Sequence, residues 1–193
     1  AARCLDCPVE AGCAFSARKI YLGRNTGWPV SVVSLDPSLE ARTRALREGP
    51  YGRCVFACDN DVVDHQVVAL EFSGGATAAF TMCGLTHEIS RTIKLMGTAG
   101  EIGGHMERNE ILLHTFAGGR TETIRPPRPE SGHAGGDEGI MRHFYQILTG
   151  KTEEGLTSIG ISVQSHLMAF AAEEARLTGK VVDLKEFAAK MGG

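Results

Sequence analysis

A regular alternation of side chains along residues 61–106 constrains the fold of this chain more than any other feature. In residues 64–72, Val68, Leu70 and Phe72 share one parity, and the other parity mixes polar with small apolar residues. A period of two is the period of a pleated strand. A Ser-Gly-Gly run at 73–75 interrupts the alternation before residues 76–82 resume it, and glycine allows the positive φ that a hairpin turn requires. The segment therefore predicts an antiparallel hairpin.

The alternation predicts further strands along the chain. Ile89, Ile93 and Leu95 indicate a third strand, and a Gly-Thr-Ala-Gly turn at 97–100 leads into a fourth at Glu101 and Ile102. Two more strands are expected at 110–116 and 120–124, on either side of a pair of glycines. Because the strands form one block and the later helices another, the sequence predicts the α+β class. We expect a mostly antiparallel, open-faced β-sheet with helices packed on one face.

Capping residues and apolar periodicity predict three helices. The first covers residues 39–48, with Asp36 as its N-cap and its arginines Arg42, Arg44 and Arg47 mostly solvated. The second ends at Leu148, with Asp137 as its N-cap. The third covers 158–178 and ends at Gly179. The second helix is expected to bury an apolar stripe of Ile140, Phe144, Ile147 and Leu148.

Shorter elements are expected where apolar residues cluster. Valines at 30, 32 and 33 suggest an edge strand, and residues 53–57 a strand that leads into the central block. Residues 181–184 suggest a last short strand, and residues 185–190 a terminal helical turn.

The outward face of the sheet is the expected contact surface for a second subunit. This face is predicted to carry Thr77, Thr81, Thr92 and Lys94, together with His65 or Glu71. It is too polar for a core and too rich in alanine and valine for a face that only meets water. We expect homo-oligomerisation through it, and a solvated sheet face is the alternative.

Composition limits the classes of partner and compartment. A chain of 193 residues forms one large domain or two small ones, and a net charge of −3 with no long basic run argues against nucleic acid and anionic membranes as partners. Its apolar runs are far shorter than the roughly 20 residues of a membrane helix. Six cysteines without a secretory signal predict a reducing, cytoplasmic location. Because the chain begins with Ala1, we expect it to be a fragment of a longer protein.

The first chemical candidate is the cysteine set near the start of the chain. Cys4, Cys7 and Cys13 have spacings compatible with a structural zinc site, completed by Cys54 or Cys58. If residues 53–57 form a strand, however, the last two sulfurs are too far apart to chelate one ion together. The sequence favours buried, reduced thiols over zinc.

The second candidate is the glycine-rich loop of residues 131–139, which precedes a helix. Free backbone N–H groups at a helix start suit an anionic or hydroxyl-rich ligand, and His133 is a hydrogen-bonding group or proton donor near neutral pH. A flexible loop before a capped helix explains the same pattern. We find no G-x-G-x-x-G after a strand, no P-loop and no nucleophile elbow in the sequence.

Five segments together resemble the C-terminal domain of the Gfo/Idh/MocA oxidoreductases, in register along nearly the whole chain. These segments are CLDCPVEAGCAFSARKIYL, EGPYGRCVFACDNDVVDHQVVALEFSGGATAAFTM, RTIKLMGTAGEI, SGHAGGDEGIMRHF and SHLMAFAAEEARLTGKVVDL. The resemblance implies a dihydrodipicolinate-reductase-like domain over residues 1–193, with residues 1–35 as an irregular, cysteine-containing entry segment. The family's nucleotide-binding domain is absent from this chain.

The resemblance also implies a function. The domain is expected to bind the substrate and build the oligomer of a dehydrogenase that uses NAD or NADP on a sugar, cyclitol or related polyol. The family's lysine and Asp/His catalytic groups have no counterpart here, so the chain alone is expected to be inactive. His133 is expected to hydrogen-bond a substrate hydroxyl, and Asp137 to cap the helix and orient the loop. Ala134 stands where the family more often has glycine.

Two other functions stay open. One is a non-catalytic assembly module with a dimeric sheet interface. The other is a domain of an NAD-dependent glycosidase, because some relatives in the family use the same hydride step to cleave glycosides.

Overall fold

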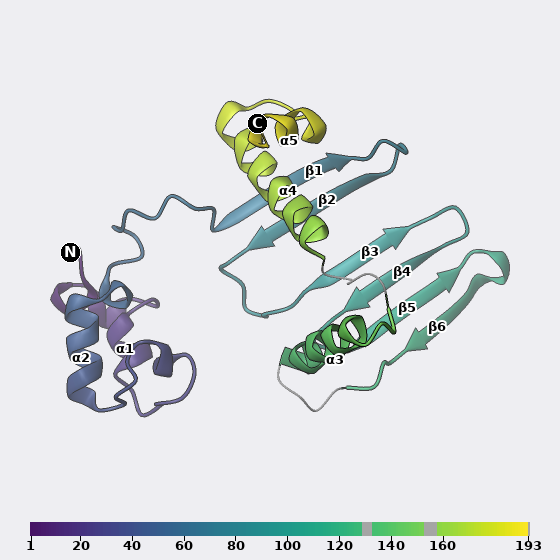
Figure 1. Ribbon diagram of the computed structural model, residues 1–193. Helices are drawn as coiled ribbons and strands as arrows, with labels where there is room; N and C mark the ends of the chain where they lie inside the picture. Colours follow the sequence, from purple (N-terminus) through teal and green to yellow (C-terminus); the bar gives the residue numbers. More distant parts are fainter. Residues whose placement is uncertain (129–132, 153–157, 193) are drawn as a thin grey trace. The chain divides into compact units, whose positions relative to one another are not determined.

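A computed structural model describes residues 1–128, 133–152 and 158–192 (Figure 1). The chain divides into two compact units, Ala1–Val63 and Asp64–Gly193. The first is a small helical unit, and the second contains all the strands that the structure describes.

The unit Ala1–Val63 is built from short helices around a small core. Its elements are η1 (Cys4–Asp6), η2 (Glu10–Gly12), α1 (Ala17–Tyr21), η3 (Val30–Val32), α2 (Leu39–Glu48) and η4 (Pro50–Gly52). Cys4, Ala17 and Leu46 are buried together, and Leu5 and Leu22 are among the half-buried residues that pack against them. The core therefore joins η1, α1 and α2.

Helix α2 has the predicted bounds but a different N-cap. The hydroxyl oxygen of Ser38 accepts a hydrogen bond from the backbone N–H of Ala41, so Ser38 is the N-cap and the prediction of Asp36 was wrong. The Asp36 carboxylate instead accepts from the backbone N–H of Ser38 at 2.8 Å. Arg44 and Arg47 are exposed as predicted, whereas Arg42 is buried, with 6% of its surface exposed.

Two predicted strands of this unit are absent for local reasons. Residues 30–32 form η3, because the N–H groups of Val32 and Val33 donate to carbonyls three residues earlier and are not available to a neighbouring strand. Residues 53–57 make a turn in which the N–H of Ala57 donates to Cys54. Their extended contact is one antiparallel bridge between Arg3 and Arg53, supported by a hydrogen bond of 2.9 Å from Cys54 N–H to the Ala2 carbonyl.

The unit Asp64–Gly193 confirms the α+β class and the antiparallel pairing. Its strands are β1 (His65–Glu71), β2 (Thr77–Cys83), β3 (Thr92–Met96), β4 (Gly100–His105), β5 (Glu110–Thr115) and β6 (Arg120–Ile124). They form two sheets, β1-β2 and β3-β4-β5-β6, with every pairing antiparallel. The predicted meander is thus divided between β2 and β3.

The strand register separates a polar from an apolar face. In β1-β2, His65, Glu71, Thr77 and Thr81 lie on one face with Val67, and all five are exposed. In the larger sheet, Thr92 and Lys94 lie on the face opposite a row of apolar residues. That row consists of Ile93, Leu95, Ile102, Ile111, Leu113 and Ile124. The predicted open-face residues therefore share faces as expected within each sheet.

Three helices complete the second unit: α3 (Gly136–Leu148), α4 (Ile159–Thr178) and α5 (Leu184–Met191). Helix α4 begins after its N-cap Ser158 and ends at Gly179. The φ of Gly179 is 66°, in the left-handed region that glycine adopts without penalty. The predicted strand at 181–184 is wrong, because the Asp183 carboxylate accepts from the N–H groups of Lys185 and Glu186 and begins α5 there.

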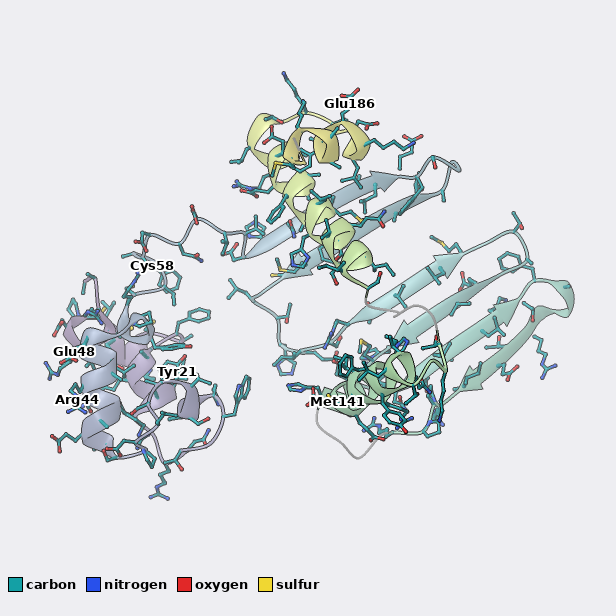
Figure 2. All side chains as sticks on the ribbon, in the orientation of Figure 1. Tyr21, Arg44, Glu48, Cys58, Met141 and Glu186 are labelled. Atoms are coloured by element: carbon teal, nitrogen blue, oxygen red, sulfur yellow. The ribbon has the colours of Figure 1, made fainter. Side chains whose placement is uncertain are left out.

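The apolar stripe of α3 is exposed, contrary to the prediction. Ile140 is 62% and Phe144 54% exposed, and Met141, labelled on α3 in Figure 2, is 65% exposed. Among the described residues of this unit, the buried hydrophobic residue is Ala171. The 3.6-residue period identified which face of α3 is apolar, but it does not specify what covers that face.

Candidate functional site

The two predicted site residues meet at the start of α3. His133 opens a short 3-10 turn, η6 (His133–Gly135), and Asp137 is the second residue of α3. His133 Nδ1 lies 2.9 Å from Asp137 Oδ2 and 3.0 Å from Oδ1. The spacing of four residues, with a tight turn between them, brings the imidazole onto the carboxylate.

The backbone of this turn is in an uncommon conformation. His133 has a φ of 51° and Gly135 a φ of 87°, both in the left-handed region. Glycine adopts this region without penalty, whereas a histidine there is uncommon and is stabilised by its surroundings. The bond to Asp137 is such a contact. Residues 131 and 132 of the predicted loop lie outside the described residues.

Asp137 does not cap the helix, which corrects the prediction. The N-cap is Gly135, which has no side chain to accept from the first turn of α3. The Asp137 carboxylate instead accepts from the imidazole, so its role in the geometry is to hold His133. Sequence reasoning missed this pair, although its i, i+4 spacing is the signal for such a contact.

The pairing fixes how the imidazole meets a ligand. A carboxylate accepts hydrogen bonds, so Nδ1 carries the proton and donates to Asp137. In the neutral imidazole, Nε2 is then an acceptor that faces away from Asp137. The side chains of His133 and Asp137 are 85% and 63% exposed, so a ligand has free access to both.

The charge around the turn favours neutral ligands. Asp137 and Glu138 both lie in the first turn of α3. Their negative charges offset the positive end of the helix dipole, which would otherwise attract an anion. Arg142 forms an ion pair with Glu138 and not with Asp137, so the Asp137 carboxylate is paired with the imidazole of His133. An anionic ligand would be repelled by these carboxylates, whereas two hydroxyl groups of a neutral ligand can donate, one to Nε2 and the other to a carboxylate oxygen.

The cysteines are all free thiols in the structure. Cys4 is buried, Cys83 is exposed and the other four are intermediate. Within the part of the chain that the structure describes, no group of three or more Cys, His, Asp and Glu side chains is placed to hold a metal ion. The geometry therefore adds no support for zinc on Cys4, Cys7 and Cys13.

The glycines of β4 do not form a nucleotide-phosphate loop. Gly100, Gly103 and Gly104 are paired with neighbouring strands. A Cβ on Gly100 would lie 2.3 Å from the His114 carbonyl oxygen, and one on Gly104 would lie 2.9 Å from Ile93 Cγ2. These glycines serve the close packing of the sheet.

No helix in residues 1–128, 133–152 and 158–192 is both long and apolar enough to cross a membrane. Comparisons of the chain with protein-family models, with curated proteins and with solved structures found no match.

Proposed function

We propose that this chain is the substrate-binding and oligomerisation part of an NAD(P)-dependent oxidoreductase that acts on a sugar, cyclitol or related polyol. The observation that carries the proposal is the pair of His133 and Asp137, held 2.9 Å apart at an exposed helix start. The sequence resemblance implies that substrate recognition involves the same loop.

The pair suits a hydroxyl-bearing ligand. A polyol hydroxyl donates to His133 Nε2, and a neighbouring hydroxyl donates to a free lone pair of Asp137. Because Asp137 fixes the imidazole ring through Nδ1, the acceptor Nε2 points in a defined direction. Catalytic bases are oriented in the same way by a neighbouring hydrogen-bonding group. On this chain the two residues bind and orient the ligand, and the hydride acceptor is assigned to another part of the enzyme.

The exposed faces of Asp64–Gly193 support the oligomerisation half of the proposal. Val67, on the polar face of β1-β2, is 73% exposed, and Ile93 of the larger sheet is 57% exposed. Large exposed apolar areas are typical of interaction surfaces. The same observation favours the second candidate, a non-catalytic assembly module, which differs in having no ligand at His133.

A titration with neutral polyols separates these two candidates. We expect myo-inositol or glucose to shift the imidazole NMR signals of His133 saturably in the full chain. Because His133→Asn also removes this signal, its binding of the polyol is followed by calorimetry and should be lost. Asp137→Asn should weaken binding about tenfold, because a neutral amide accepts from Nδ1 more weakly than a carboxylate. His87→Asn, an exposed histidine outside the site, is the matched control.

Two results would contradict the ligand-binding proposal. One is the absence of saturable shifts with any neutral polyol, which would leave the assembly module. The other is tighter binding of a sugar acid than of the matching neutral sugar, because the carboxylates of Asp137 and Glu138 disfavour an anion.

A further inference from the structure

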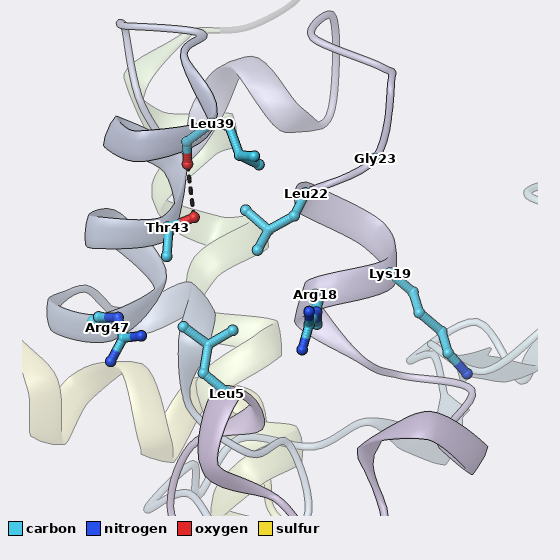
Figure 3. Close-up of a pocket in the computed structure, with 8 residues that line it drawn as sticks. All are labelled: Leu5, Arg18, Lys19, Leu22, Gly23, Leu39, Thr43 and Arg47. Carbon is cyan, nitrogen blue, oxygen red and sulfur yellow. Dashed lines mark hydrogen bonds between the residues drawn. The ribbon is translucent and has the colours of Figure 1, made fainter.

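A hollow of about 480 Å³ lies in the unit Ala1–Val63, between η1, α1 and α2 (Figure 3). Its apolar lining is Leu5, Leu22 and Leu39, and the first two also pack on the buried core. Leu39, Thr43 and Arg47 follow at intervals of four along α2, so one face of that helix forms a wall. Small-molecule sites in proteins typically enclose about 300–1,000 Å³, and this hollow has that size.

The charged lining of the hollow is cationic. Arg18, Lys19 and Arg47 contribute to it, and its described lining contains no Asp or Glu. Lys19 Nζ is engaged elsewhere, because it donates to the carbonyls of Ala11 at 2.5 Å and Cys13 at 3.2 Å. Figure 3 shows its side chain directed away from Leu5 and Leu22. Arg18 and Arg47 are therefore the two cations available to a ligand.

Neither of these guanidinium groups has a hydrogen-bond or ion-pair partner among the described residues. Three other arginines of the unit have one, whereas the exposed Arg24 and Arg44 have neither kind of partner among the described residues. Arg3 donates to the carbonyls of Leu46, Glu48 and Gly49, and Arg53 forms an ion pair with Asp59. Arg42 donates to the carbonyls of Tyr21, Gly23 and Asn25. Arg18 and Arg47 differ from Arg24 in that both line the same leucine-lined hollow.

We propose that this hollow binds a small organic oxyanion with an apolar body. A guanidinium group recognises a carboxylate or a phosphate with two parallel hydrogen bonds, so Arg18 and Arg47 bind the head group. The hydrocarbon part of the ligand covers Leu5, Leu22 and Leu39 and removes them from water. The Thr43 hydroxyl donates its proton to the Leu39 carbonyl at 2.7 Å, so it has none for the oxyanion, and recognition of the head group rests on the two guanidinium groups. This site is independent of His133 and of the proposed oxidoreductase function.

The test is a calorimetric titration of the full chain with octanoate, using octyl phosphate in a parallel arm to identify the preferred head group. We expect one saturable site for at least one of these two anions. Acetate lacks the apolar body and octylammonium has the wrong charge, so each should bind at least tenfold more weakly. Leu39→Ala, at a residue that is 57% exposed, should weaken octanoate binding several-fold without loss of folding.

Charge variants complete the test. Arg18→Gln with Arg47→Gln should weaken binding of the anion at least tenfold, because each charge-assisted hydrogen bond contributes about a factor of ten. Arg24→Gln is the matched control, since Arg24 is exposed in the same unit and does not line the hollow. An equal loss in Arg24→Gln, or equal binding of octylammonium, would overturn the proposal. So would the absence of saturable binding of both anions, including the case in which a second copy of the chain covers the hollow.

Discussion

At the scale of single residues, Arg42 connects α2 to the loop that follows α1. Its Nη1 lies 2.7 Å from the Tyr21 carbonyl oxygen and 3.1 Å from that of Gly23. Its Nε is buried without a partner among the described residues. A buried guanidinium group is costly to desolvate, so the bonds to the loop carbonyls have to offset that cost.

We expect Arg42→Met to lower the free energy of unfolding of this unit by about 2 kcal/mol, because the carbonyls of the 21–25 loop lose charged donors. Met has a similar length and keeps most of the packing. Urea unfolding followed by circular dichroism measures the change. Arg44→Met, at an exposed position of the same helix, should change stability by no more than about 0.5 kcal/mol. Equal stability of both variants would show that the loop carbonyls are satisfied by water.

At the scale of elements, α2 is specified at both ends by side-chain and backbone contacts. Ser38 caps its start, and Gly49 ends it. Beyond that end, η4 approaches so closely that a Cβ on Gly52 would lie 1.7 Å from the Leu46 carbonyl oxygen. Only glycine permits this contact. Gly49 at the end of the helix and Gly52 in the turn that follows it therefore fix this part of the unit together.

The start of α2 should make the stability of the chain depend on pH. The backbone N–H of Ser38 holds the pKa of Asp36 below its ordinary value of 3.8, with smaller contributions from the Ser38 side chain and Arg44. A carboxyl group whose pKa is lower in the folded state stabilises the fold at pH values above its unfolded-state pKa. This contribution is lost as the pH falls through the folded-state pKa. Wild type should therefore exceed Asp36→Asn in stability at pH 6, and the difference should shrink below about pH 4.

Urea unfolding of the two proteins between pH 2 and pH 7 measures this difference. The amide side chain of the Asp36→Asn variant keeps an oxygen that accepts from Ser38, so the comparison isolates the charge. A difference that stays constant over this range would contradict the assignment.

Local patterns predicted most elements because local contacts determine them. The helix at 39–48 and the strand at 120–124 have the predicted bounds, since a cap or an alternation defines each. The valines at 30–33 were misassigned because apolar content alone does not distinguish a strand from a 3-10 turn. The strand predicted at 181–184 failed because Asp183 begins a helix there.

The candidate site was predicted in part. Composition and the following helix identified His133 and Asp137. Their direct bond depends on a positive φ at His133, which is rare for a residue with a Cβ and leaves no mark in the sequence. The hollow beside Arg18 was not predicted either, because its walls come from three elements that are distant in sequence.

At the scale of the whole molecule, the two units differ in how much apolar surface they cover. Both units expose large apolar side chains, but Ala1–Val63 contains a buried core, whereas Ala171 is the buried hydrophobic residue among the described residues of Asp64–Gly193. We therefore expect the chain to self-associate through the face of β1-β2 that carries Val67. Val67→Lys should shift sedimentation velocity profiles toward the monomer at micromolar concentration, because it places a charge in a dehydrated contact.

Ser73→Lys is the control for this experiment, since it adds the same charge at the exposed hairpin turn outside that face. A wild-type chain that is monomeric at micromolar concentration would refute the self-association. Equal effects of both variants would assign it to net charge instead of this face.

The bridge between Arg3 and Arg53 brings the entry and the exit of the helical unit side by side. The hydrogen bond from Cys54 to Ala2, 2.9 Å long, closes the same loop. A module whose entry and exit are adjacent can be transplanted into a surface turn of an unrelated host without stretching the host's backbone. Residues 2–54 therefore have the geometry of an insertable module, and inserting them would bring the leucine-lined hollow into another protein.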